Sequence, residues 1–159
     1  MDLDAADAVI LTELQKEGRR SNAELAERVG LSASACHRRV KALEASGVIR
    51  GYVALLDAEA LGRGLTVLVL ATLENQRRDT LEAFERAVAE IEEVMECRLT
   101  TGAEDYLLRL QVRDARDYER VHRERLSGLP GLARLVSNIA MRTVFARTAL
   151  PVAVSPQRS

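Results

Sequence analysis

The sequence has few of the residues that build covalent or metal-bound frameworks. Its 159 residues include only two cysteines, Cys36 and Cys97, and two histidines, His37 and His122, and no tryptophan. Two well-separated cysteines are too few for a disulfide scaffold or a four-ligand zinc site, so we expect both thiols to be reduced and packed. We therefore expect no metal site and no cofactor.

Charge of one sign and long apolar runs are also missing. The 23 Lys and Arg residues nearly cancel the 24 Asp and Glu residues, which leaves a formal net charge of −1. The overall field therefore cannot attract a polyanion, and any DNA binding must depend on locally placed basic residues. No window approaches the roughly 18 apolar residues of a spanning helix, and the first residues do not form a secretory signal. We expect a cytoplasmic protein with no membrane partner.

The residue patterns of catalysis are absent as well. The two histidines lie far apart on separate predicted helices, which gives poor support for a metal or triad site, and no serine lies in a nucleophile elbow. The sequence also contains no glycine-rich loop of the nucleotide-binding kinds. These absences predict that the protein is not an enzyme.

The first 50 residues have the pattern of three short helices. Asp4 and Asp7 can cap a first helix that stops near Gly18, and Ser21 with Glu24 forms a capping box for a second. Gly30 ends that second helix, and Ser32 caps a third. The third helix has an apolar stripe and then a stop, formed by Cys36, Val40, Leu43 and Gly47. Two helices joined by so short a turn are typical of a helix-turn-helix.

The rest of the chain alternates between strand and helix patterns. We interpret 48–57 as a strand and 57–64 as a partly helical connector. A strand over 65–73 is followed by a helix over 80–92 and by two strands over 94–102 and 105–114. A second helix then runs from Asp114 to the GLPGL break, and a last strand covers 133–144, which gives the order strand, helix, strand, strand, helix, strand. This order is that of a ferredoxin-like domain, whose helices cover one sheet face and whose other face a second copy can cover.

The fold class is therefore α+β with four segments. Residues 1–50 form an N-terminal helix-turn-helix, winged or plain, and 51–64 form a strand and linker. Residues 65–147 form a ferredoxin-like βαββαβ sandwich domain, and 148–159 a C-terminal tail that we expect to be loosely ordered.

The third helix has one apolar and one polar side. At about 100° per residue, Ser34, His37, Arg38 and Lys41 lie opposite the stripe of Cys36, with Arg39 on the flank. In a helix-turn-helix the second helix of the pair reads the major groove and the preceding helix meets phosphate. Our candidate DNA contacts are Ser21, Asn22, Ser32, Ser34, His37, Arg38, Arg39 and Lys41.

Each basic side chain suits a particular contact. Arg38 can fork onto a guanine, Arg39 and Lys41 better suit phosphates, and His37 can contact either. The pattern alone leaves an alternative open, namely an ordinary three-helix unit with a solvated charged face.

Two stretches resemble a known family. The segment SNAELAERVGLSASACHRRVKALEASGVIRGYVALLD is similar to the DNA-binding half of the Lrp/AsnC transcription regulators of bacteria and archaea. Downstream, EVMECRLTTGAEDYLLRLQVRD followed by LSGLPGLARLVSNIAMRTV resembles the family's effector-binding and assembly domain. The likeness runs from Leu3 to about Val144.

The resemblance implies a nucleoid-associated regulator that dimerises through its sheet domains, stacks into octamers, and binds a small amino acid or related metabolite between dimers. The effector residues it implies are Thr101, Gly102, Asp105 and Tyr106, with Ser137 and Asn138 on the last strand as weaker candidates. A glycine lets backbone amides approach a ligand carboxylate closely, and an aspartate can form an ion pair with a ligand's α-ammonium group. Without the resemblance, Gly102 would merely permit a turn that Asp105 caps.

Glu104 departs from the commoner family pattern, which has an uncharged residue before the Asp-Tyr pair. An extra acid in the pocket would favour a ligand with a second cationic group; the alternative is that Glu104 points into solvent. Two other functions also remain open: an architectural protein that coats DNA without an effector, and a ligand-sensing module that has lost DNA binding.

Overall fold

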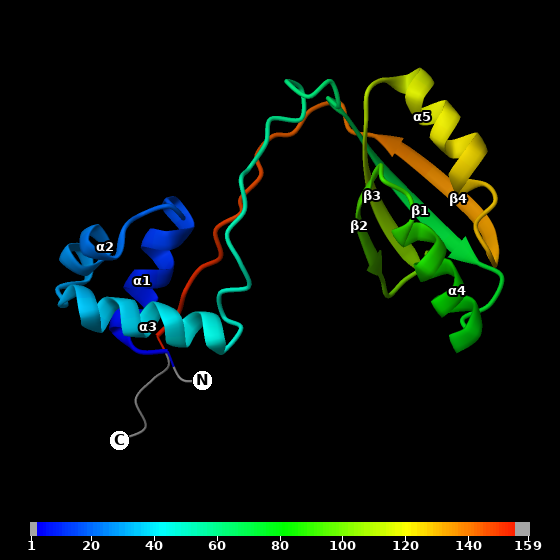
Figure 1. The fold of residues 1–159 in the computed structure, drawn as a ribbon. Helices are drawn as coiled ribbons and strands as arrows, with labels where there is room; N and C mark the ends of the chain where they lie inside the picture. Colours follow the sequence, from blue (N-terminus) through cyan, green and yellow to red (C-terminus); the bar gives the residue numbers. More distant parts are fainter. Residues whose placement is uncertain (1–2, 155–159) are drawn as a thin grey trace. The chain divides into compact units, whose positions relative to one another are not determined.

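The computed structural model describes residues 3–154, which form two compact units. One unit contains the residues up to Leu55 together with those from Phe145 onward, and the other contains Leu56–Val144. The C-terminal segment thus returns to the unit in which the chain begins. Figure 1 shows the helical unit and the sheet unit, which are described separately below.

The N-terminal unit contains three helices, α1 (Ala5–Lys16), α2 (Asn22–Val29) and α3 (Ala33–Ala45). Their starts agree with the predicted caps, because Asp4 and Ser21 each form a capping box and Ser32 caps α3. The three helices enclose one apolar core, whose buried members are Ile10, Leu11, Leu25, Ala26, Cys36, Val40 and Leu43. No strand occurs within residues 3–50.

The C-terminal segment adds to this unit without forming a helix or strand. The side-chain amide of Gln15 donates to the Leu150 carbonyl at 3.0 Å, and the Leu150 amide donates to the Gln15 side-chain oxygen at 2.6 Å. Val152 is partly buried against the core of the three helices. Residues 148–154 of the predicted loose tail therefore have a defined place on α1, and 155–159 lie outside the described residues.

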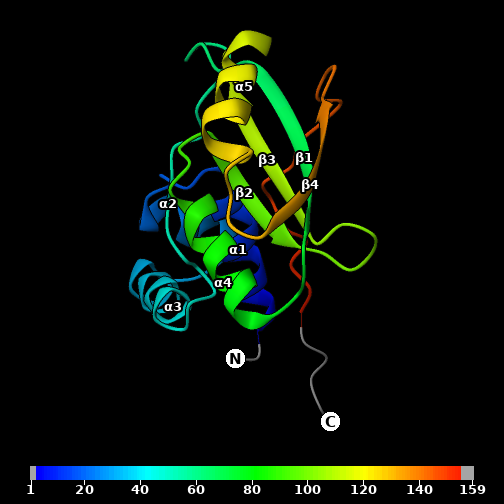
Figure 2. The same cartoon turned by 90° about the vertical axis from the view of Figure 1, so that its right-hand side faces the viewer.

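The second unit is a four-stranded antiparallel sheet with its helices on one face, as Figures 1 and 2 show. The strands are β1 (Leu65–Leu73), β2 (Val94–Leu99), β3 (Tyr106–Val112) and β4 (Leu132–Ile139), arranged in the order β2-β3-β1-β4. The helices are α4 (Arg78–Ala89) and α5 (Ala115–Val121), and α5 continues into a π-helical segment, η1 (His122–Leu126). This topology confirms the predicted ferredoxin-like fold.

Alternate residues of β1 and β3 face the helices and form the core. Val67, Val69 and Leu108 are fully buried there, and Phe84 of α4 packs against them. The opposite, open face of the sheet carries half-buried leucines, including Leu68, Leu70 and Leu107. Half-buried leucines on an uncovered face indicate a surface suited to a further partner.

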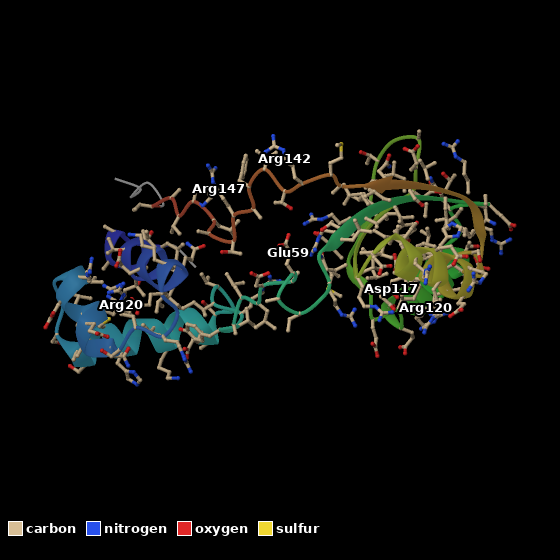
Figure 3. The ribbon with its side chains drawn as sticks, turned by 90° about the horizontal axis from the view of Figure 1, so that it is seen from above. Arg20, Glu59, Asp117, Arg120, Arg142 and Arg147 are labelled. Atoms are coloured by element: carbon tan, nitrogen blue, oxygen red, sulfur yellow. The ribbon has the colours of Figure 1, made fainter. Side chains whose placement is uncertain are left out.

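Asp117 links α5 to its surroundings. Its carboxylate accepts hydrogen bonds from the Arg113 amide at 3.1 Å and from the Arg120 guanidinium at 2.8 Å, and Arg120 also pairs with Glu93 at 2.8 Å. Figure 3 shows Asp117 and Arg120 next to each other on this helix. These hydrogen bonds hold the pKa of the nearly buried Asp117 carboxyl far below its usual range.

One predicted strand is wrong, and another ends early. Residues 48–57 form neither helix nor strand, although valine and tyrosine give this stretch a strand-like composition. A strand needs a neighbour to pair with, and within the described chain this stretch has none. The last strand stops at Ile139 rather than near residue 144. Ala140 still donates to the Thr66 carbonyl at 3.0 Å, but β1 begins at Leu65, so it extends only one residue beyond that contact and cannot pair with a strand that reaches 144.

Candidate nucleic-acid interface and effector site

A tight turn sets the relation between α2 and α3. Gly30 ends α2 with a φ of 73°, and the Leu31 amide donates to the Ala26 carbonyl at 3.0 Å. Ser32 then begins α3, since its hydroxyl accepts from the Ala35 amide at 3.2 Å. The left-handed glycine reverses the chain within three residues and places α3 across α2, as a helix-turn-helix requires.

The polar side of α3 is exposed along its length. We call the side chains of Ser34, His37, Arg38 and Lys41 the α3 outer face; all four are exposed, whereas Cys36 on the opposite side is fully buried. Among the described residues, Arg38 has no hydrogen-bond or ion-pair partner. A free guanidinium next to polar donors on an exposed helix can meet base edges and phosphates.

The other exposed candidates already have local partners. The Asn22 amide nitrogen lies 3.0 Å from His37 Nδ1, and the Lys41 ammonium lies 2.9 Å from Glu44. The hydroxyls of Ser21 and Ser32 cap α2 and α3. The serines can still meet a phosphate, because the exposed amides at a helix N-terminus bind anions.

Arg39 has a different environment from Arg38. Its guanidinium lies 2.8 Å from both the Asp4 and the Asp7 carboxylates, and it is partly buried between α3 and the start of α1. These hydrogen bonds raise the pKa of the Arg39 guanidinium and lower that of the Asp4 carboxyl, where the Asp7 backbone amide has the largest effect. The predicted phosphate contact by Arg39 remains a prediction and would require both ion pairs to open.

The loop between β2 and β3 carries the predicted effector residues Thr101, Gly102, Glu104 and Asp105. Gly102 has a φ of 141°, which favours glycine, and an added Cβ would meet nothing within 4 Å. Asp105 is buried, and its carboxylate accepts from the Leu73 amide at 2.7 Å and the Gln76 side chain at 2.6 Å. The Asp105 carboxylate therefore holds the loop against the end of β1.

Glu104 is placed differently from Asp105. It is half-buried, and its carboxylate has no hydrogen-bond or ion-pair partner in the described part of the chain. The backbone carbonyl of Glu104 accepts from the Thr100 hydroxyl at 2.7 Å, which steadies the loop. Of the two adjacent acids, Glu104 is thus the one whose charge is available to a ligand.

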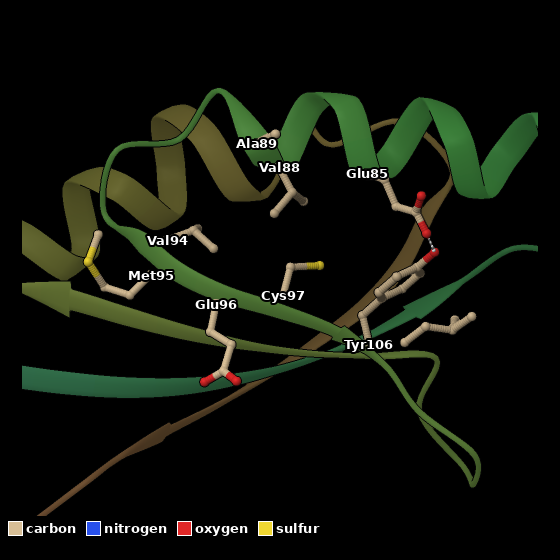
Figure 4. A pocket seen from close by; sticks show the side chains of 9 residues that line it. Glu85, Val88, Ala89, Val94, Met95, Glu96, Cys97 and Tyr106 are labelled. Carbon is tan, nitrogen blue, oxygen red and sulfur yellow. Dashed lines mark hydrogen bonds between the residues drawn. The ribbon is translucent and has the colours of Figure 1, made fainter. Parts of the chain in front are cut away.

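Tyr106 borders an open cavity of about 370 Å³ between α4 and β2 (Figure 4). Its ring is almost fully buried against Phe84, and its hydroxyl donates to Glu85 at 2.7 Å. Burial, followed by this hydrogen bond, raises the pKa of the Tyr106 phenol. The cavity is lined by Glu85, Val88, Ala89, Val94, Met95, Glu96, Cys97, Leu99 and Tyr106, so Tyr106 is the one predicted effector residue that lines it.

Ser137 and Asn138 lie on β4, which β1 separates from β3. Ser137 pairs with Val69 and its hydroxyl contacts that of Tyr118, so it faces the helices. Asn138 pairs with Leu68 and faces the open side of the sheet. The structure therefore does not gather the seven predicted effector residues into one pocket within a single chain.

Three long-range side-chain contacts could not be predicted from the sequence. Arg39 with Asp7, Gln76 with Asp105, and Gln15 with Leu150 join residues 32, 29 and 135 positions apart. Local periodicity cannot reveal such pairs, since their geometry depends on the packed fold.

Two kinds of site are not found among residues 3–154. No group of three or more His, Cys, Asp or Glu side chains is arranged to hold a metal ion. No helix in the same range is both long and apolar enough to cross a membrane.

Comparison with known proteins assigns both units. Residues 3–50 match the family model described as winged helix-turn-helix DNA-binding, and residues 66–150 match the model described as Lrp/AsnC ligand binding domain. The leucine-responsive regulatory protein of Escherichia coli is 45% identical over 143 residues, which cover 90% of this chain and 87% of that protein.

Solved structures agree with this assignment. A transcriptional regulator from Neisseria meningitidis in complex with L-Met has a TM-score of 0.89 and 36% identity, over 94% of this chain and 96% of that one. An AsnC family transcriptional regulator from Agrobacterium tumefaciens has a TM-score of 0.89 and 34% identity, over 94% and 97%. The family is one of transcription regulators rather than enzymes. The chain belongs to the Lrp/AsnC family, and it is a DNA-binding transcription regulator with a ligand-binding domain.

Proposed function

We propose that this regulator binds specific DNA sequences through the α3 outer face, and that a small amino acid or related metabolite controls this binding from the sheet unit. The observation that carries the proposal is the exposed row of donors on α3, in which Arg38 has no partner within the part of the chain that the structure describes. A bidentate contact from an arginine to guanine is worth roughly 1–3 kcal/mol of discrimination.

A homodimer is the smallest assembly that fits this function. Two copies would present two α3 helices to successive major-groove segments about 34–36 Å apart, or a multiple of that distance. The chain itself supports self-association, because large apolar side chains are half-buried on the open sheet face and exposed on the segments before and after the sheet. Val53 is 85% exposed, Phe145 71% and Met141 99%. A second copy that covers these residues removes them from water.

The effector would bind where the β2–β3 loop of one dimer meets another dimer, as dimers assemble toward an octamer. The scattered placement of Tyr106, Ser137 and Asn138 in one chain supports a pocket completed by a neighbouring chain. The free Glu104 carboxylate favours a ligand with a second cationic group. An effector can shift assembly only if it binds one arrangement more tightly than the other.

Footprinting on the protein's own upstream DNA tests sequence-specific binding. A few phased protected sites are expected, whereas uniform coverage would indicate a DNA-coating protein. Arg38→Ala should weaken specific binding by about 1–3 kcal/mol and leave the oligomer unchanged. Arg116→Ala removes an exposed arginine from the sheet unit and is the matched control. If the two variants bind DNA equally well, the α3 outer face is not the reading surface.

Calorimetric titration with lysine, arginine, leucine, alanine and asparagine tests the effector. We expect heat of binding with a cationic amino acid, and light scattering in its presence should show a change in oligomer size. A clear preference for leucine would reject the charged-ligand hypothesis.

A further inference from the structure

We infer that Asn22 fixes the tautomer of His37, so that His37 presents an Nε2–H donor to a guanine in the major groove. Asn22 stands at the first position of α2, and His37 lies on the α3 outer face one turn after its start. The inference rests on the DNA-binding surface proposed above and adds a base-reading role for one residue and a positioning role for another.

The contact between the two side chains defines which atom donates. Asn22 Nδ2 lies 3.0 Å from His37 Nδ1. An amide nitrogen carries two hydrogens and no lone pair to share, so it can only donate. His37 Nδ1 must therefore accept, and in the neutral imidazole the single proton then sits on Nε2.

The direction of this donor follows from the position of the pair. Both residues are exposed, and among the described residues His37 forms no hydrogen bond other than the one at Nδ1. Asn22 holds the ring from the α2 side, which leaves Nε2 as the ring atom available to an external partner. A ring held at one nitrogen also loses less conformational freedom when the other nitrogen binds.

Guanine is the base whose edge best suits a lone N–H donor. Its major-groove edge presents two acceptors, N7 and O6, with no competing donor. Adenine places an amino group beside N7, and cytosine offers an amino donor that would face Nε2–H. Arg38, the next residue on the same surface, is also a guanine-type donor, so we expect adjacent contacts to a guanine-rich half-site.

The tautomer can be read directly by NMR. A long-range ¹H–¹⁵N correlation spectrum distinguishes a proton on Nε2 from one on Nδ1, and the chain has only two histidines. His122 lies on η1 in the sheet unit, so His122→Gln assigns the signals without touching the DNA-binding unit. At about pH 8, where an imidazole in water is neutral, we expect His37 to carry its proton on Nε2.

Two variants of Asn22 separate positioning from charge. Asn22→Ala removes the donor, so the ring is no longer held and the share of the Nδ1–H form should rise. Asn22→Asp replaces the donor by an acceptor, so at a pH high enough to keep the ring neutral the proton should move to Nδ1 and leave Nε2 as an acceptor; the binding assays are run at that pH. The added charge weakens binding to all duplexes alike, whereas the tautomer changes only the preference among bases.

Selection of binding sites from a random duplex pool gives the functional result. For Asn22→Ala we expect the preference for guanine at one position to fall by about two- to tenfold, the range of a single net hydrogen bond. For Asn22→Asp we expect guanine to be lost at that position. His37→Gln, which keeps an amide donor at the ε position, should retain more of the preference than His37→Ala.

The outcomes separate this inference from the proposed function. A His37 proton found on Nδ1 in the unmodified protein overturns the inference, as do Asn22 variants that select the same bases as the unmodified protein. If Arg38→Ala alters the selected sequence while the Asn22 and His37 variants do not, only the inference fails. If no α3 variant alters it, the proposed reading surface fails as well.

Discussion

Two neighbouring arginines on α3 occupy opposite situations. Arg38 is exposed and has no partner among residues 3–154, whereas the Arg39 guanidinium lies 2.8 Å from the carboxylates of both Asp4 and Asp7. The carboxylate of Asp7 is nearly buried, so it depends on Arg39 to balance its charge. Side chains one residue apart on a helix point about 100° away from each other, which allows one arginine to face solvent while the next stabilises the fold.

Removal of Arg39 should therefore cost stability rather than DNA affinity. We expect Arg39→Met to lower the free energy of unfolding by about 1–2 kcal/mol, since it leaves Asp7 without its partner and keeps the aliphatic stem. Urea denaturation followed by circular dichroism measures this loss. If the folded variant shows a smaller salt dependence of DNA binding instead, Arg39 contacts phosphate, as the sequence predicted.

At the scale of single elements, the turn between α2 and α3 depends on one backbone angle. Gly30 has a φ of 73°, and an added Cβ there would meet nothing within 4 Å, so its substitution costs backbone strain alone. We expect Gly30→Ala to destabilise the N-terminal unit by about 1–2 kcal/mol. Gly128 is equally open but lacks a positive φ, so Gly128→Ala is the matched control. Equal thermal midpoints for the two variants would contradict this account.

The α5 helix should be sensitive to acid. Hydrogen bonds from Arg113 and Arg120 hold the pKa of Asp117 below 3.8, the ordinary value of an aspartate side chain, so the folded state binds fewer protons than the unfolded state. The stability that Asp117 supplies is present above that value and is lost as the pH falls below it. We expect Asp117→Asn to be less stable at neutral pH and to lose less stability between about pH 5 and pH 2. Acid titration of the unfolding midpoint in both proteins measures this difference.

Elements with local signals could be predicted from the sequence, and elements that need a distant partner could not. The starts of α1, α2 and α3 follow from the caps Asp4, Ser21 and Ser32, because a cap bonds to an amide three residues away. Residues 48–57 are predicted as a strand from composition, but a strand needs a paired neighbour, and this stretch has none among residues 3–154.

The candidate site was predictable to the same extent. The exposed side of α3 follows from helical periodicity alone. The engagement of Asp105 by Gln76 does not, because the two residues lie on separate loops that only the folded sheet brings together. The sequence therefore indicates which face of α3 is polar, but not which acid of the β2–β3 loop is free.

At the scale of the whole molecule, the helical unit is built from both ends of the chain. The backbone of Leu150 forms two hydrogen bonds with the Gln15 side chain, and Val152 is partly buried against the core of the three helices. A chain that ends at Thr148 should therefore unfold this unit more easily, by about 1 kcal/mol, although every helix is intact. A chain that ends at Val154 keeps both contacts and is the control. Equal stability of the two truncated chains would show that the contacts do not matter.

The first and last strands of the sheet unit are neighbours in the sheet, so the chain enters and leaves this unit at adjacent residues. β1 and β4 are antiparallel partners, and the Ala140 amide donates to the Thr66 carbonyl at 3.0 Å. The sheet unit is therefore inserted within the sequence of the helical, DNA-binding unit, and the chain enters and leaves the sheet at adjacent strands. Such an arrangement makes the sheet unit exchangeable. A different αβ domain that has adjacent termini and forms a dimer of the same spacing could be grafted between Leu55 and Phe145, and the chimera would then bind the same operator while responding to another metabolite.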